Sequence, residues 1–117
     1  MKLIDILNPT FKGSQQEKEW IAKGYQLPQY DVEQLQQQTY KNPTWVHFGG
    51  GNIFRAFPAT MLQQVLNTGK YDRGVIMAET FDYEIIDTVY NPYKNLSLSV
   101  SLCPNGTIEK QVIASVT

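Results

Sequence analysis

The sequence has little of several residue types on which common protein chemistries depend. It holds one cysteine, Cys103, and one histidine, His47, which excludes a disulfide framework or a cysteine-rich zinc site within one chain. Its 10 basic and 11 acidic residues leave a formal net charge of -1, so nothing attracts the chain to nucleic acid or an anionic membrane. No apolar run approaches the roughly 20 residues of a membrane helix. We therefore expect a soluble, cytoplasmic protein with neither nucleic acid nor membrane as a partner.

The residues that are present suit one modest globular domain. The chain has 117 residues, of which 42% are hydrophobic and 18% charged. His47 lies between apolar neighbours in a predicted strand, and no second histidine or cysteine is placed to share a metal ion. We expect a buried, hydrogen-bonded histidine here, and no metal site.

One stretch organises the rest of the chain. The bulky residues Trp45 to Phe48 predict a buried strand, and Gly49, Gly50 and Gly51 follow it. Apolar residues then recur at helical spacing, at Ile53, Phe54, Phe57, Met61, Leu62 and Val65. A strand, a glycine turn and a helix open a dinucleotide-binding βαβ unit, in which backbone N–H groups at the helix start hold a pyrophosphate. Phe54 replaces the third glycine of the G-x-G-x-x-G pattern, and a purely structural glycine turn is the alternative.

Two motifs resemble one enzyme family. Residues 47–57 resemble the N-terminal signature of the long-chain polyol and uronate dehydrogenases, the mannitol dehydrogenase family, which includes fructuronate (mannonate) and tagaturonate reductases. That signature is a strand, G-x-G-N, and then an Arg-Ala or Arg-Gly pair. Its places are filled here by Gly49, Gly51, Asn52, Arg55 and Ala56. Residues 106–116 resemble a second family segment, so the resemblance covers about Trp45 to Val116.

The resemblance implies an NAD(P)-dependent oxidoreductase that acts on a sugar acid or a polyol. In the family, a lysine, an asparagine and a histidine in a helical C-terminal domain carry the substrate chemistry. We therefore expect this chain to be an N-terminal piece with no catalytic residue and no catalytic domain. It would comprise a helical leader over residues 1–43 and an incomplete Rossmann-like α/β domain over residues 44–117.

The predicted cofactor site consists of residues around the glycine turn and one later acid. Its members are Gly49, Gly50, Gly51, Asn52, Ile53, Arg55 and Glu79. Glu79 ends the second predicted strand, residues 74–79, where an acidic residue binds the ribose hydroxyls of NAD. It lies farther along the chain than the usual spacing of about 20 residues, and a solvated strand-end carboxylate is the alternative. Asp82 is a nearby competitor or a helix N-cap. Arg73 precedes the strand and leaves NADP possible beside NAD.

Local signals predict the remaining elements. In the leader, Ser14 with Glu17 and Asp31 with Gln34 suit the starts of two short helices. The glycine helix should run from about Asn52 to Leu66 with a kink at Pro58, unless Pro58 is its true start after an irregular loop.

Farther on, residues 96–102 alternate apolar and polar side chains, which predicts a half-buried strand with one wet face. Residues 108–116 should return antiparallel to it, forming a C-terminal β-hairpin after the turn at residues 104–106.

Two functional classes follow. The first is the NAD-binding part of a fructuronate- or mannonate-like oxidoreductase, and the second is a small nucleotide-binding or interaction domain without chemistry of its own. So few parallel strands would leave a sheet edge unpaired, so we expect either self-association through that edge or a longer chain.

Overall fold

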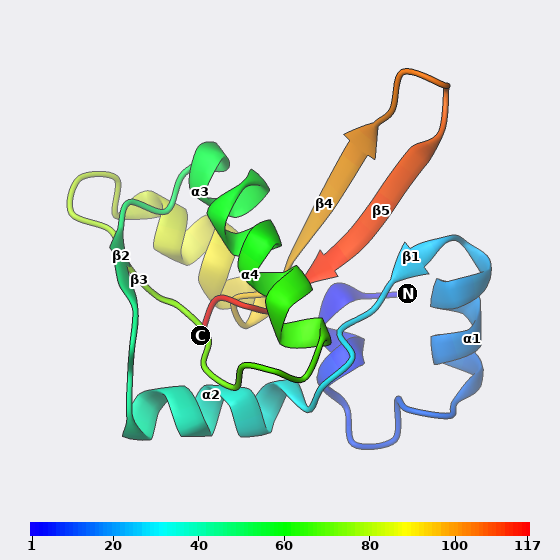
Figure 1. Cartoon of the computed structure of the whole chain (residues 1–117), viewed down its shortest axis with the longest axis horizontal. Helices are drawn as coiled ribbons and strands as arrows, with labels where there is room; N and C mark the ends of the chain where they lie inside the picture. The colour runs from blue at the N-terminus through cyan, green and yellow to red at the C-terminus, as the bar shows by residue number, and fades with distance from the viewer.

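Two small sheets organise the chain, and the computed structural model describes all residues from 1 to 117 (Figure 1). The first sheet has the strand order β1, β5, β4; β5 runs antiparallel to β4 and parallel to β1. The second pairs β2 in parallel with β3, with His47 opposite Met77. The strands are β1 (Tyr25–Gln26), β2 (Val46–Phe48), β3 (Ile76–Ala78), β4 (Ser97–Leu102) and β5 (Ile108–Ile113). This is a mixed α/β fold.

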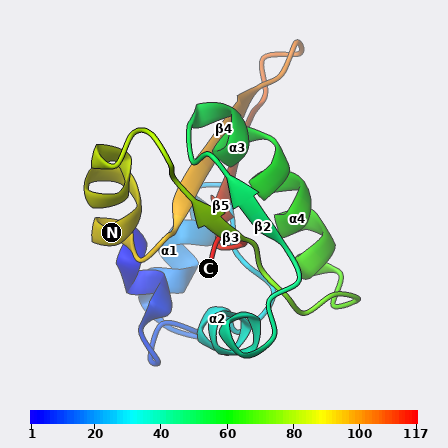
Figure 2. The ribbon, with the colours of Figure 1, turned by 90° about the vertical axis from the view of Figure 1, so that its left-hand side faces the viewer.

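Helical segments surround the two sheets. Figure 2 shows β2 and β3 side by side, with α4 on one side of them and the helical segment after β3 on the other. The segments are η1 (Leu3–Leu7), α1 (Gln15–Ala22), α2 (Val32–Lys41), α3 (Asn52–Ala56), α4 (Pro58–Asn67), the π-helix η2 (Ile86–Tyr90) and η3 (Asn91–Tyr93). No helix is both long enough and apolar enough to cross a bilayer.

The helices α1 and α2 begin at side chains that accept otherwise free backbone N–H groups. The Ser14 hydroxyl accepts the N–H of Glu17 at 3.2 Å, and the Asp31 carboxylate accepts that of Gln34 at 3.0 Å. In a capping box the Glu17 carboxylate would accept the N–H of Ser14, but here it accepts the N–H of Gly13. The helix starts are therefore fixed by short-range hydrogen bonds that the sequence pattern predicts.

Each sequence-based alternative for the helix after the glycine turn is partly right. Pro58 starts a helix, α4, as the second alternative predicts, but residues 52–56 form the short helix α3 and not an irregular loop. A break at Phe57 between the two helices takes the place of a kink within one helix. Phe57 leaves helical geometry with φ -121° and ψ -74°, and Pro58 opens α4. Proline lacks the N–H that a continuous helix would use and clashes with the carbonyl four residues back, so the break falls directly before it.

The two faces of the hairpin strand β4 are oriented differently from the prediction. Its apolar side chains face solvent, with Leu98 45%, Val100 57% and Leu102 79% exposed, whereas Ser97 and Ser99 are half-buried. Figure 1 shows β4 and β5 projecting from the body of the molecule, so no other layer covers that face.

The returning strand is also shorter than expected, because β5 ends at Ile113. The chain then crosses to the second sheet, where Val116 pairs in parallel with Val75.

Two apolar clusters form the core. One gathers around α4 and β3, and the other lies between the first 32 residues and β5. The first contains Leu35, Phe54, Ala59, Leu62, Leu66, Val75, Tyr90, Ile113 and Val116; the second contains Phe11, Trp20, Val32, Leu96, Val112 and Ala114. Residues on both sides of position 43 therefore contribute to both clusters, and burial of these side chains supplies most of the driving force for folding.

Candidate functional site

The glycine turn lies where the two parallel strands of the second sheet end. The Gly49 N–H donates to the carbonyl of Ala78 at 2.8 Å, which carries the pairing of β2 and β3 into the turn. The residues after Ala78 consequently lie beside the turn, at the carboxyl edge of the sheet (Figure 2). In open α/β sheets, ligands bind in the crevice outside this edge.

The three glycines have different surroundings. Gly49 has a φ of +102°, a conformation that side-chain-bearing residues rarely adopt. At Gly50, an added Cβ would lie 2.6 Å from the sulfur of Met77 and 3.1 Å from the hydroxyl of Tyr90. Gly51, which caps α3, has an ordinary φ of -76° and open space where a Cβ would stand. Gly49 also has open space where a Cβ would stand, so Gly51 is the one glycine of the three that combines an ordinary φ with open space.

The N–H and the carbonyl of Gly50 each form a hydrogen bond with a side chain. Its N–H donates to the Glu79 carboxylate at 2.9 Å, and its carbonyl accepts the Tyr90 hydroxyl at 2.7 Å. Tyr90 is 3% exposed, and this burial raises its pKa to about 12. The hydroxyl therefore remains a donor across the physiological pH range.

Glu79 lies beside the glycine turn, at the end of β3. Its second carboxylate oxygen accepts the N–H groups of Thr80 at 3.1 Å, Phe81 at 3.0 Å and Asp82 at 3.3 Å. The hydrogen bonds from Gly50 and from these three residues lower the pKa of Glu79 below its ordinary value. Glu79 is half-buried, and its carboxyl group is ionised at neutral pH.

The predicted N-cap role of Asp82 is wrong. The carboxylate of Asp82 makes no hydrogen bond within the chain, and only its backbone N–H takes part, as a donor to Glu79. Glu79 instead collects the free N–H groups of this loop.

The start of α3 brings three further predicted residues together. The Arg55 guanidinium donates to the Asn52 amide oxygen at 2.6 Å, while the Nε of Arg55 is buried and has no partner within the chain. The Ile53 side chain is 83% exposed and points away from the core. The N–H of Gly51 also lacks a partner within the chain. This end of α3 therefore presents unused donors next to an open glycine.

The side chain of His47 is only half-buried and makes no hydrogen bond, which corrects the expectation of a buried, hydrogen-bonded histidine. Its ring stacks on Phe54 with centroids 4.4 Å apart and meets Trp45 edge-on at 6.1 Å. Phe54, the residue at the third glycine position, is 3% exposed in the first core cluster. The helix thus packs on the strand through an aromatic stack in place of the close approach that a glycine allows.

Arg73 lies at the opposite end of β3 from Glu79. It donates to the carbonyl of Asn42 at 3.1 Å and forms an ion pair with Asp72 at 2.8 Å. Glu79 lies six positions farther along an extended chain, a span of about 20 Å. Arg73 therefore does not contact a group bound beside Glu79.

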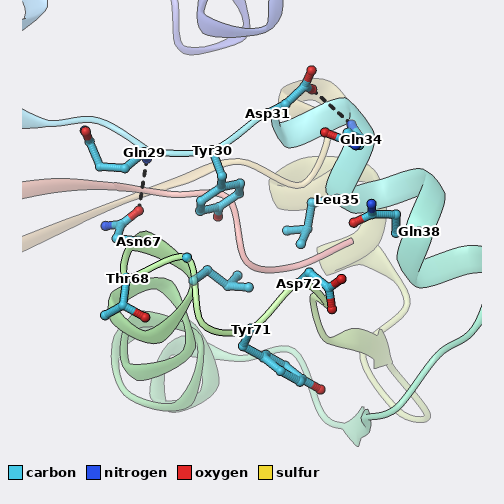
Figure 3. A pocket seen from close by; sticks show the side chains of 12 residues that line it. Gln29, Tyr30, Asp31, Gln34, Leu35, Gln38, Asn67, Thr68, Tyr71 and Asp72 are labelled. Carbon is cyan, nitrogen blue, oxygen red and sulfur yellow. Dashed lines mark hydrogen bonds between the residues drawn. The ribbon is translucent and has the colours of Figure 1, made fainter.

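A separate pocket of about 460 Å³ lies between α2 and the end of α4 (Figure 3). Its lining is mostly polar, includes the carboxylates of Asp31 and Asp72, and contains no lysine or arginine. The Gln29 N–H donates to Asn67 across the pocket at 3.0 Å. An acidic lining without basic groups does not suit a pyrophosphate, and the glycine turn remains the candidate site.

Tyr90 and Met77 are members of the site that the sequence does not reveal. Tyr90 follows the glycine that it contacts by 40 positions, and no motif includes it. Only the packing of η2 against the turn identifies it.

Comparison with known proteins relates the chain to sugar and polyol dehydrogenases. It is 50% identical over 97 residues to a D-mannonate oxidoreductase of Thermotoga maritima, an alignment that covers 83% of this chain and 18% of that enzyme. No family model matches the chain.

Two solved structures share the fold. A D-sorbitol dehydrogenase in substrate-free form aligns with 80% of this chain at a TM-score of 0.63 and 24% identity. A Pseudomonas fluorescens mannitol 2-dehydrogenase, in ternary complex with NAD and D-mannitol, aligns with 85% of it at a TM-score of 0.60 and 20% identity.

The resemblance to the mannitol dehydrogenase family is confirmed. The chain spans about a fifth of each relative, with 18% of the oxidoreductase and of the sorbitol dehydrogenase and 20% of the mannitol dehydrogenase covered. The two structural alignments show that the fold of this chain recurs as one part of larger dehydrogenases.

Proposed function

We propose that this chain forms part of the NAD-binding site of an oxidoreductase that transfers a hydride between nicotinamide and a sugar acid or polyol. A fructuronate- or mannonate-like substrate is the class we favour, because the mannonate oxidoreductase is 50% identical over the aligned residues. In this proposal, β2, the glycine turn, α3, α4 and β3 are the first βαβ unit of a Rossmann-like domain.

The surroundings of Gly51 are the observation that carries the proposal. Its N–H has no partner within the chain, and open space adjoins its α-carbon. The nearby Arg55 has a buried Nε without a partner and is a cation suited to phosphate. Gly49, Gly50, Gly51, Asn52, Ile53 and Arg55 would line the pyrophosphate end of the cofactor.

Glu79 would accept the adenosine ribose hydroxyls. Its carboxylate is ionised and half-buried at the end of β3, and a fixed negative charge there repels the additional phosphate of NADP. We therefore propose NAD as the preferred cofactor, with NADP as the competitor to test. NAD supplies the hydride chemistry when bound, whereas the residues of this chain bind and orient it. We assign none of them to proton or hydride transfer.

Titration with NADH tests the proposal. Trp45 lies directly before β2, so quenching of tryptophan emission should report binding near the turn. Gly51→Asp should abolish binding, because its carboxylate would occupy the phosphate position. The substitution meets no internal clash, since no atom lies within 4 Å of the added Cβ. Gly51→Ala is the matched control, which adds bulk without charge and should retain measurable binding.

The cofactor preference is read from the same titration. NADH should bind more tightly than NADPH. Glu79→Ala should weaken the binding of NADH and reduce the difference in affinity between NADH and NADPH. Equal binding of NADH by the parent protein and Gly51→Asp would contradict the proposed site. Absence of saturable binding in the parent protein would contradict cofactor binding by this chain.

A further inference from the structure

We propose that Tyr90 is a positioning residue that aims the Gly51 N–H outward, in concert with Glu79, which fixes the preceding peptide group. The inference rests on the proposed function, because the outward N–H is useful only if the glycine turn holds a pyrophosphate. It extends the site to a residue on η2 that lies outside both family-like motifs.

The two side chains hold successive peptide groups. Glu79 accepts the Gly50 N–H at 2.9 Å and so fixes the peptide between Gly49 and Gly50. Tyr90 donates to the Gly50 carbonyl at 2.7 Å and so fixes the peptide between Gly50 and Gly51. Each side chain therefore restrains one of the two planes that meet at the Gly50 α-carbon.

Peptide planarity converts the Tyr90 contact into a direction for the next N–H. In a trans peptide, the carbonyl of one residue and the N–H of the next point in opposite directions within one plane. The structure contains no cis peptide bond. Because the Gly50 carbonyl points at the buried Tyr90, the Gly51 N–H points away from it, toward the exposed side of the turn where it has no partner.

Three adjacent glycines need such a restraint. Glycine has access to far more backbone conformations than other residues, so an unrestrained run of three samples many orientations of its N–H groups. A donor held in its bound orientation before the ligand arrives avoids that ordering cost on binding. Tyr90 itself is well anchored, since it belongs to the first core cluster.

The π-helical form of η2 supports this role. A π-helical turn contains an additional residue and shifts the side chains that follow it, and such turns are frequent at functional sites. Tyr90 is the last residue of η2, and its ring is almost fully buried under the turn.

Tyr90→Phe removes the hydroxyl with little change in shape. Tyr93→Phe is the matched control, because it makes the same chemical change three residues later at a side chain that is 45% exposed. We expect Tyr90→Phe to bind NADH about tenfold more weakly, as for the loss of one buried hydrogen bond, and Tyr93→Phe to bind like the parent protein. Equal affinity of Tyr90→Phe and the parent protein would overturn the positioning role.

Backbone ¹⁵N relaxation without cofactor provides the second readout. The order parameter of the Gly51 N–H should fall from about 0.85 toward 0.6 in Tyr90→Phe, with β4 and β5 unchanged. Glu79→Ala should instead lower the order parameter chiefly at Gly50. This reciprocal pattern would not arise from general destabilisation.

The two readouts separate failure of this inference from failure of the proposed function. An unchanged Gly51 order parameter in Tyr90→Phe overturns the role of Tyr90 whether or not NADH binds. A parent protein that does not bind NADH overturns the proposed function, while the relaxation data still decide whether Tyr90 restrains Gly51. If Tyr90→Phe does not fold, an unchanged Gly50 order parameter in Glu79→Ala overturns the paired restraint.

Discussion

The three adjacent glycines of the turn lie in three different environments. Gly49 needs its positive φ, Gly50 has no room for a side chain, and Gly51 leaves space open to solvent. Only the first of these requirements is a property of the local backbone. The second depends on Met77 and Tyr90, which reach the turn from other elements. The sequence pattern therefore predicts the turn but not the separate reason for each glycine.

Gly50→Ala should destabilise the protein by about 1–3 kcal/mol, because the added methyl group overpacks against the Met77 sulfur. Gly51→Ala should change the free energy of unfolding by at most about 0.5 kcal/mol. Urea denaturation measures both. In a double-mutant cycle, Gly50→Ala combined with Met77→Ala should lower the free energy of unfolding by less than the sum of the two single losses. Equal effects of Gly50→Ala and Gly51→Ala would contradict the close contact.

The Glu79 hydrogen bonds should produce a pH dependence at Gly50. The native pKa of Glu79 is lowered, so its contribution to stability is present above the unfolded-state pKa of about 4.3. It is lost as the pH falls through the lower native pKa. The Gly50 amide resonance should titrate with that same lowered pKa, and Glu79→Gln should remove the titration. A Gly50 shift independent of pH in the parent protein would argue against the hydrogen bond.

At the scale of elements, the sequence predicts best what a few neighbouring residues determine. The starts of α1 and α2 follow from Ser14 and Asp31, whose partners lie three residues later. The strand and glycine turn before α3 follow from a short motif. By contrast, β1 and β5 are paired although most of the sequence lies between them, and no local pattern predicts that contact.

Exposure of the apolar face of β4 was also beyond prediction. Alternation of apolar and polar residues predicts two distinct faces but does not specify which one a neighbouring layer covers. The candidate site shows the same limit. The position of Glu79 at the end of a predicted strand identifies it from the sequence, whereas Tyr90 is identified only by the packing of η2 against the turn.

The break at Phe57 makes Pro58 a helix-starting residue. Because α4 begins at Pro58, where no N–H is needed, Pro58→Ala should change the free energy of unfolding by less than about 1 kcal/mol. Gln64→Pro, in the interior of the same helix, should cost about 3 kcal/mol or more. Thermal or urea unfolding distinguishes the two. A large loss from Pro58→Ala would indicate that α3 and α4 depend on the proline itself.

For the molecule as a whole, the free edge of the second sheet is the feature that favours association with another chain. β2 pairs with β3 on one side only, and its side chains Val46 and Phe48 are 48% and 71% exposed. Unpaired apolar edge strands are sites of association. We therefore propose that this chain associates with itself through β2.

Phe48→Lys should reduce that association, because a charged side chain on an edge strand opposes pairing. Sedimentation velocity over a range of protein concentrations is the measurement. Leu102→Lys is the control, since Leu102 is 79% exposed at the tip of the projecting hairpin, outside the β2–β3 sheet. A parent protein that stays monomeric at every concentration would contradict association through β2.

The pairing of β1 with β5 has a consequence for synthesis on the ribosome. Lys110 donates to the carbonyl of Lys23, 87 positions earlier, and the second core cluster joins Trp20 to Val112. During translation, the first forty residues therefore emerge well before the strand that completes their core. Their apolar side chains remain exposed for several seconds at about 5–20 residues per second. The nascent chain is thus most vulnerable to chaperone capture and proteolysis before β5 leaves the exit tunnel.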